Sequence, residues 1–171
     1  VCVSTWRRVD DNAIPARGKI AGAYVNSALV KSEAMMDGYD EAIVLDQHGH
    51  VSEGSAENLF MVRNGKLITP AITSNILEGI TRRTIIKLAA AELGLETEER
   101  EIDRTELYVC DELFFCGTGV QVAAIATVDR RPVGSGKIGP VTTQIRDLYF
   151  DVVKGKVETY RAWNTPVYTD A

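Results

Sequence analysis

The feature that most constrains the fold is an Asn-Gly pair, Asn64-Gly65, between two short apolar runs. The first run is Asn58–Arg63, and the second is Lys66–Thr69. Asn-Gly accepts positive φ angles at both central positions, as a two-residue hairpin turn requires. The sequence therefore predicts two antiparallel strands joined by a tight turn, and with them a β-sheet in the middle of the chain.

Helical patterns alternate with further strand-like runs. We expect helices over Tyr24–Met36, Thr81–Leu93 and Val141–Val153, because each combines apolar spacing with a glycine just beyond its end. In the first helix the expected core-facing stripe is Val25, Leu29, Ala34 and Met36. A short helix is expected at 105–111, and strands near the start of the chain and at 41–46, 96–100, 113–115 and 120–128. This interleaving predicts an α/β or α+β protein with a mixed sheet.

Length, charge and apolar runs limit the function classes. The chain has 171 residues, which fits one domain, and a formal net charge of -5 with no basic stripe, which argues against a nucleic-acid partner. The longest apolar runs are far shorter than the ~20 residues that cross a bilayer. Because the chain begins at Val1 rather than methionine, we expect it to be a fragment.

The three cysteines and two histidines indicate no metal site. The cysteines are odd in number and lack CxxC spacing, so we expect neither disulfides nor zinc, and a reducing, cytoplasmic compartment. His48 and His50 share one turn and could bind a metal only with additional ligands.

Four local features could carry chemistry. Lys19 lies beside small residues, Glu53 lies on a short extended segment, and the turn Cys116-Gly-Thr-Gly119 carries a hydroxyl. The N–H groups of Ile80 and Thr81 would begin a helix, and helix N-termini bind anions. Each feature also has an ordinary reading, as a solvated lysine, a loop charge, a tight turn or a capped helix.

Taken in order, these features and their neighbours resemble the class IV (fold-type IV) pyridoxal-phosphate aminotransferases, and within them the branched-chain-amino-acid aminotransferases. The resemblance covers essentially the whole chain. The matching segments are Gly18–Tyr24, Glu53–Phe60, Leu67–Thr69, Leu77–Arg82, Glu106–Thr118 and Gly139–Thr142. The sequence departs from the family at Ala56, where glycine is common, and at Gln121–Ile125, where a glutamate and a proline are usual.

The resemblance implies a fold and a division of the chain. The implied fold is a mixed-strand pseudo-barrel with flanking helices, the large domain of these enzymes. Residues 18–171 would form this domain, which binds pyridoxal 5'-phosphate. Residues 1–17 would be a lead-in strand and loop from an N-terminal domain that is missing here.

The resemblance also implies a role for each candidate residue. Lys19 would be the Schiff-base lysine and the proton shuttle, Glu53 would pair with the pyridine nitrogen, and Tyr24 would lie near the phenolic oxygen. Ile80, Thr81 and Thr118 would hold the phosphate, and Leu77 would pack on the ring. Thr118 and Gly119 would meet the substrate carboxylate.

The implied activity is transfer of an amino group between leucine, isoleucine or valine and 2-oxoglutarate, by a homodimer or larger homo-oligomer. Two sister activities of the family stay open, D-amino-acid transamination and aminodeoxychorismate lyase chemistry. A third alternative is that the isolated chain is a non-catalytic binding or assembly module, because a missing N-terminal domain would leave apolar surface exposed.

Overall fold

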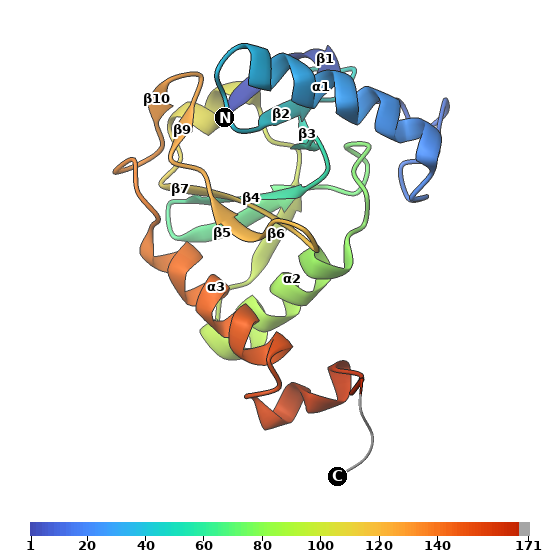
Figure 1. Cartoon of the computed structure of the whole chain (residues 1–171). Helices are drawn as coiled ribbons and strands as arrows, with labels where there is room; N and C mark the ends of the chain where they lie inside the picture. Colours follow the sequence, from blue (N-terminus) through green and yellow to red (C-terminus); the bar gives the residue numbers. More distant parts are fainter. Residues whose placement is uncertain (168–171) are drawn as a thin grey trace.

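The computed structural model describes residues 1–167, and Figure 1 shows the arrangement of the chain. The helices are α1 (Tyr24–Met36), α2 (Ile80–Leu93) and α3 (Pro140–Val153), with 3-10 turns η1 (Ala21–Ala23), η2 (Arg104–Tyr108) and η3 (Glu158–Trp163). The strands are β1 (Cys2–Arg7), β2 (Ala42–Leu45), β3 (Val51–Gly54), β4 (Asn58–Arg63), β5 (Lys66–Pro70), β6 (Thr97–Arg100), β7 (Glu112–Gly117), β8 (Gln121–Ala124), β9 (Thr127–Val128) and β10 (Arg131–Pro132).

A five-stranded sheet in the order β6-β5-β4-β7-β8 forms the centre of the molecule. The hairpin predicted from Asn64-Gly65 is confirmed: β4 and β5 pair antiparallel, and the two turn residues have φ of 52° and 74°. Strand β6 adds parallel to β5, so the sheet is mixed.

A smaller sheet, β1-β2-β3, packs on one face of the large one. Strand β1 runs parallel to β2, and the connection between them contains α1. Strand β3 pairs antiparallel with β2 and ends just before β4. Arg7, the last residue of β1, pairs with Leu45 of β2, and Leu45 pairs with Val51 of β3, so the segment that follows β1 leaves the small sheet at the end where β3 begins.

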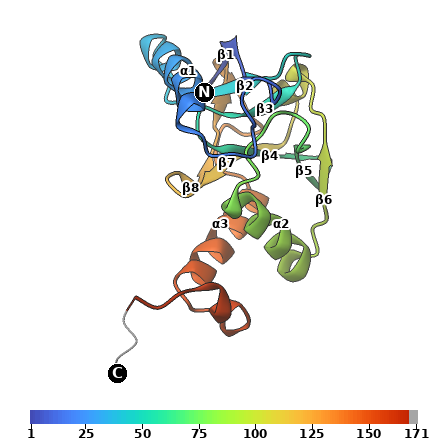
Figure 2. The same cartoon turned by 90° about the vertical axis from the view of Figure 1, so that its right-hand side faces the viewer.

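The core is divided by the sheets into layers. Leu59 and Met61 of β4 belong to the cluster shared with the small sheet, whereas Phe60 and Val62 belong to the cluster beneath α2 and α3. This alternation follows from the two-residue period of a strand. Helix α1 covers the outer face of the small sheet, so the order is helix, sheet, sheet, helices, as Figure 2 shows from the side.

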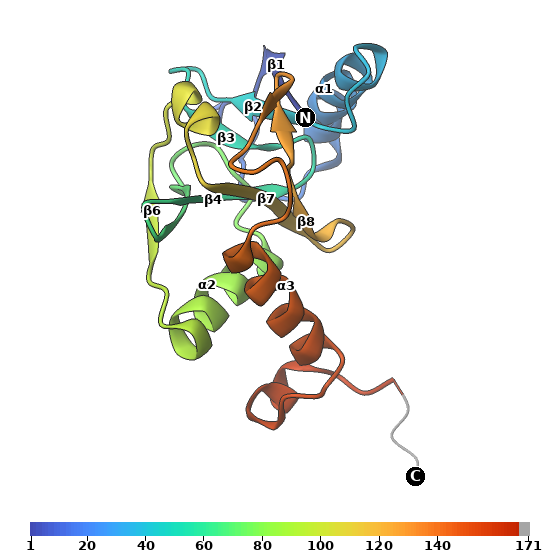
Figure 3. The same cartoon turned by 90° about the vertical axis from the view of Figure 1, so that its left-hand side faces the viewer.

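The predicted α/β class with a mixed sheet and flanking helices is confirmed. Among residues 1–167 the strands form separate sheets, and they do not close into a barrel. The helix predicted at 105–111 is the 3-10 turn η2. The small hairpin β9-β10, seen beside β1 in Figure 3, was not predicted, and neither were η1 and η3.

The stripe predicted for α1 was wrong in three of its four positions. Val25, Leu29 and Met36 are exposed, and the helix buries Val30 and Ala34 against the small sheet. Several apolar residues of α1 thus face outward, and the periodicity alone did not distinguish the two faces.

A buried carboxylate fixes the start of α3. Glu112 of β7 accepts hydrogen bonds from the backbone N–H of Val141 at 3.0 Å and of Thr142 at 2.7 Å, and from the Thr142 hydroxyl at 2.7 Å. Gly139 precedes the helix, and a Cβ at this position would lie 2.1 Å from the Glu112 carboxyl carbon. The close approach therefore requires glycine.

Within the described part of the chain, no helix is long and apolar enough to cross a membrane.

Candidate active site

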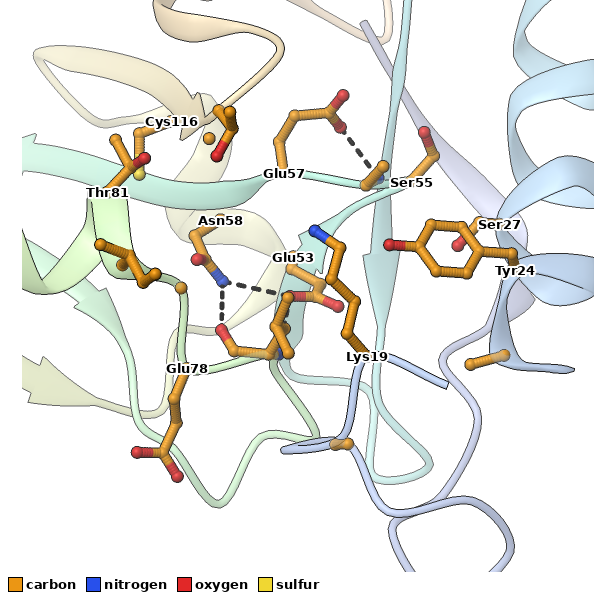
Figure 4. Close-up of a pocket in the computed structure, with 18 of the residues that line it drawn as sticks. Lys19, Tyr24, Ser27, Glu53, Ser55, Glu57, Asn58, Glu78, Thr81 and Cys116 are labelled. Carbon is orange, nitrogen blue, oxygen red and sulfur yellow. Dashed lines mark hydrogen bonds between the residues drawn. The ribbon is translucent and has the colours of Figure 1, made fainter. Parts of the chain in front are cut away.

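A pocket of about 260 Å³ opens where five segments meet: the β1–α1 connection, the start of α1, the β3–β4 turn, the turn before α2 and the end of β7 (Figure 4). It is lined by seven of the eight residues singled out from the sequence: Lys19, Tyr24, Glu53, Leu77, Ile80, Thr81 and Thr118. Gly119, the eighth, is not among the lining residues, whereas its neighbour Gly117 is.

Glu53 is the buried carboxyl group of the pocket. It lies near the end of β3 and is 4% exposed. One carboxylate oxygen, Oε1, lies 2.9 Å from a guanidinium nitrogen of Arg8, which is also buried. The other, Oε2, accepts hydrogen bonds from Asn58 Nδ2 at 3.1 Å and from the Leu77 N–H at 3.0 Å. Both oxygens are therefore satisfied from within the chain.

Burial dominates the protonation of this carboxyl group. Removal from water raises the pKa of Glu53 to about 7, although the Arg8 guanidinium and the Leu77 N–H act in the opposite direction. A carboxyl group with a pKa in this range inside a pocket is typical of a functional site.

Helix α2 begins at the pocket without a side-chain cap. Its N-cap residue is Gly79, which has no side chain to accept from the first N–H groups. Thr81 is buried, and the Ile80 side chain is exposed. The free N–H groups and the helix dipole make this end favourable for an anion such as a phosphate.

Gly79 is also fixed by a close approach. A Cβ there would lie 2.3 Å from Asn58 Oδ1, so a larger residue would displace the Asn58 amide. The same amide donates to the Leu77 carbonyl oxygen at 2.8 Å. Asn58 thus contacts both Glu53 and the turn that starts α2.

Lys19 and Tyr24 line the wall of the pocket opposite the start of α2. In Figure 4 the Lys19 amine points toward the middle of the pocket, near Glu53, and the Tyr24 hydroxyl points toward Lys19. Lys19 is exposed at the surface, and Tyr24, the first residue of α1, is 42% exposed. The pocket therefore holds an accessible primary amine on the same wall as a phenol.

Glu57 and Cys116 complete the lining. Burial raises the pKa of Glu57, whose Oε2 accepts from the Ala56 N–H at 3.0 Å. Cys116 is fully buried within β7, and burial raises the pKa of its thiol. Among residues 1–167, no group of three or more His, Cys, Asp or Glu side chains is arranged to hold a metal ion.

Two functional candidates were missed by the sequence reasoning. Asn58 lies inside the segment that carries the family resemblance, so that segment contained a signal for it. Arg8 lies in a short run that matches no local motif, and only the pairing of β1 with β2 brings it to Glu53. A sequence pattern read segment by segment does not contain that contact.

A buried acid, an accessible lysine and an open helix N-terminus around one pocket describe an enzyme site for a small anionic cofactor or substrate. The family model for amino-transferase class IV matches residues 1–128. The chain belongs to the class IV aminotransferase family.

Individual relatives and solved structures agree on a narrower group. The chain is 55% identical over 97% of its length to a probable branched-chain-amino-acid aminotransferase of Aquifex aeolicus, and 46% identical over 94% to the branched-chain-amino-acid aminotransferase of Escherichia coli K12. These matches span 53% and 52% of the relatives.

The crystal structure of the branched-chain amino acid aminotransferase from Thermobaculum terrenum in its PLP-bound holo form superposes with a TM-score of 0.96 at 50% identity, over 98% of this chain and 55% of that one. The corresponding enzyme of Thermoproteus uzoniensis with norvaline gives 0.94 at 46% identity, over 98% and 55%. The chain thus spans about half the length of the proteins that it matches.

Proposed function

We propose that the protein containing this chain is a pyridoxal-phosphate-dependent branched-chain-amino-acid aminotransferase, and that this chain supplies most of the cofactor site. The observation that carries the proposal is the single pocket joining Lys19, Glu53 and the uncapped N-terminus of α2. The holo-form neighbour at 50% identity supports the choice of cofactor.

The residues of the pocket fit the three chemical parts of pyridoxal phosphate. The uncapped start of α2 offers N–H groups to the phosphate, with Thr81 and Thr118 beside it. Glu53 offers a buried acid to the ring nitrogen, and Lys19 offers an amine to the aldehyde. Leu77 and Tyr24 line the space between them, where they would contact the ring and its phenolic oxygen.

When bound, the cofactor supplies an electron sink for the pair left behind when the substrate Cα loses its proton. Glu53, as a buried carboxylate, would accept a hydrogen bond from the protonated ring nitrogen and so favour its protonated form. Lys19 Nζ would act as the general base that takes the Cα proton and delivers it to the former aldehyde carbon of the cofactor. Thr118, which lines the pocket, would orient the substrate carboxylate, together with Gly119, which follows it just outside the lining.

The direct test is covalent trapping on Lys19. The full-length protein is incubated with pyridoxal phosphate, reduced with borohydride and mapped by peptide mass spectrometry. We expect a pyridoxyl group on Lys19, and we expect Lys19→Ala to lose both the label and turnover. Lys137→Ala, which removes an exposed lysine outside the pocket, is the matched control. A wild-type protein without label at Lys19 would overturn the assignment.

A panel of amino donors tests the reaction. We expect leucine, isoleucine and valine to donate to 2-oxoglutarate, with D-alanine inactive and no pyruvate released from aminodeoxychorismate. Activity toward either of the latter would place the protein in a sister branch of the family.

Three further parts of the proposal concern the whole protein. It acts on small amino acids and 2-oxo acids as a homodimer or larger homo-oligomer, which analytical ultracentrifugation would test. It works in the cytoplasm, in keeping with three free, buried cysteines. Residues 18–171 would be the cofactor domain and 1–17 a lead-in whose strand β1 joins the small sheet, and the last four residues lie outside the described part.

A further inference from the structure

Glu53 is held from two sides by residues with no assigned role. Arg8 pairs with Oε1, and Asn58 donates to Oε2. Each of the two residues also bonds the backbone of the turn before α2: Arg8 Nε donates to the Asn75 carbonyl at 3.3 Å, and Asn58 Nδ2 donates to the Leu77 carbonyl at 2.8 Å. The acid and the turn are therefore fastened by the same two side chains.

The Arg8 contact affects the charge state of Glu53. Two buried ionised groups are stable only as a pair, so Arg8 favours the ionised form of Glu53, and Glu53 compensates the buried guanidinium. The Gln47 side chain in turn donates to the Arg8 carbonyl at 2.8 Å, which fixes the backbone from which Arg8 extends.

The Asn58 contact fixes the orientation of the Glu53 carboxylate. Its amide donates to Oε2 and to Leu77, while its oxygen lies against Gly79, so the rotamer is fixed on both sides. Oε2 also accepts from the Leu77 N–H, which closes a small ring of hydrogen bonds between β3, β4 and the turn.

From these contacts we infer that Arg8 and Asn58 are positioning residues: Arg8 favours the carboxylate form of Glu53, Asn58 orients it, and together they set the distance between this acid and the open N-terminus of α2. The inference rests on the proposed function, in which those two features hold opposite ends of one cofactor. Arg8 and Asn58 would then hold Glu53 and the start of α2 at the separation that the cofactor requires.

The test of the charge effect uses cofactor-free, full-length protein. With 13C-labelled glutamate and Glu53→Gln for assignment, NMR follows the titration of Glu53 directly. In Arg8→Met we expect the midpoint to rise by about 1–3 pH units, the range by which a neighbouring opposite charge lowers a carboxyl pKa. Arg8→Lys should restore most of this difference. Arg161→Met, which breaks an exposed ion pair, is the control and should leave the midpoint in place.

The test of the Asn58 role uses an isosteric change. Asn58→Asp keeps the shape, removes the donor and places a second carboxyl group beside Glu53, so we expect a higher Glu53 midpoint and at least ~10-fold weaker retention of pyridoxal phosphate. Asn164→Asp, which alters an amide bonded to Val152 away from the pocket, is the control. If Arg8→Met does not fold, Arg8→Gln, which removes the charge but keeps a hydrogen-bonding side chain, takes its place: the Glu53 midpoint should rise, and an unchanged midpoint would overturn the role of Arg8.

The two levels of the proposal fail separately. If wild-type Lys19 is labelled but the Glu53 midpoint in Arg8→Met and Asn58→Asp equals that of the controls, the positioning roles are wrong and the function stands. If the midpoints move as expected but Lys19 is not labelled, the positioning roles stand and the proposed function is wrong. The absorbance of the bound cofactor against pH gives a second readout, which should change in the variants and not in the controls.

Discussion

Opposing effects determine the protonation of one carboxyl group in this pocket, that of Glu53. It is almost fully buried, which favours the neutral acid, yet it is paired with Arg8 and accepts hydrogen bonds, which favour the anion. The balance brings its pKa to about 7. Near neutral pH, small changes in its surroundings therefore change its proton occupancy substantially.

This balance predicts a pH dependence of stability. The pKa of Glu53 is about 7 in the folded protein and ordinarily 4.5, so between these values the folded state retains a proton that the unfolded state has released. The contribution of Glu53 to the free energy of unfolding therefore falls as pH rises from 4.5 to 7. Glu53→Gln cannot ionise and should lack this fall.

The measurement is urea unfolding of cofactor-free protein at several pH values. The difference in urea midpoint between wild type and Glu53→Gln should change between pH 4.5 and 7. The wild type should become less stable relative to Glu53→Gln as pH rises. Parallel curves for the two proteins would show that burial does not raise the pKa of this group.

At the scale of elements, helices α2 and α3 begin in opposite ways. Helix α3 starts against the buried Glu112 carboxylate, which accepts three hydrogen bonds from its first turn. Helix α2 starts at Gly79 without a side-chain cap, at the pocket. The capped helix serves the framework, and the uncapped one presents its N–H groups to a ligand.

The α3 cap predicts a non-additive pair of substitutions. Glu112→Ala leaves buried donors unsatisfied and should cost about 1–3 kcal/mol of unfolding free energy. Gly139→Ala should also destabilise, because the new Cβ overlaps the Glu112 carboxyl group. The double variant should lose little more than Glu112→Ala alone, since the overlap disappears with the side chain. Urea denaturation of all four proteins measures this; additive losses would contradict the overlap.

At the scale of the whole molecule, the large sheet is covered on both faces. Neighbouring residues of β4 contribute to different core clusters, Leu59 toward the small sheet and Phe60 toward the helices. Phe60 also stacks on Phe114 of β7, with ring centroids 5.1 Å apart. The middle sheet is therefore buried across its whole thickness.

This layering predicts that truncating either of two consecutive β4 residues lowers the stability of the protein by a similar amount. Leu59→Ala and Phe60→Ala should each cost about 2–5 kcal/mol, because both side chains are fully buried. Val153→Ala, at a half-exposed end of α3, should change stability by no more than about 0.5 kcal/mol. Chemical denaturation compares the three. A tolerated change at either β4 position would show that one face of the sheet is less well packed.

How far the sequence could predict the molecule follows from the range of each interaction. The β4–β5 hairpin and the three long helices are local, and their bounds were predicted within a residue. The outward face of α1 was misjudged because burial depends on the sheet beneath it, which the helix pattern does not encode. The same holds for Arg8, whose partner Glu53 lies 45 positions later and reaches it only through the β1–β2 pairing.

The burial of Cys116 has a chemical consequence for experiments on this protein. Thiols react with alkylating agents and peroxide as thiolates, and burial raises the pKa of this thiol while its side chain is inaccessible. Cys2 and Cys110 are buried as well. The folded chain should therefore resist modification by thiol reagents, and rapid labelling of Cys116 would report local opening at the wall of the pocket.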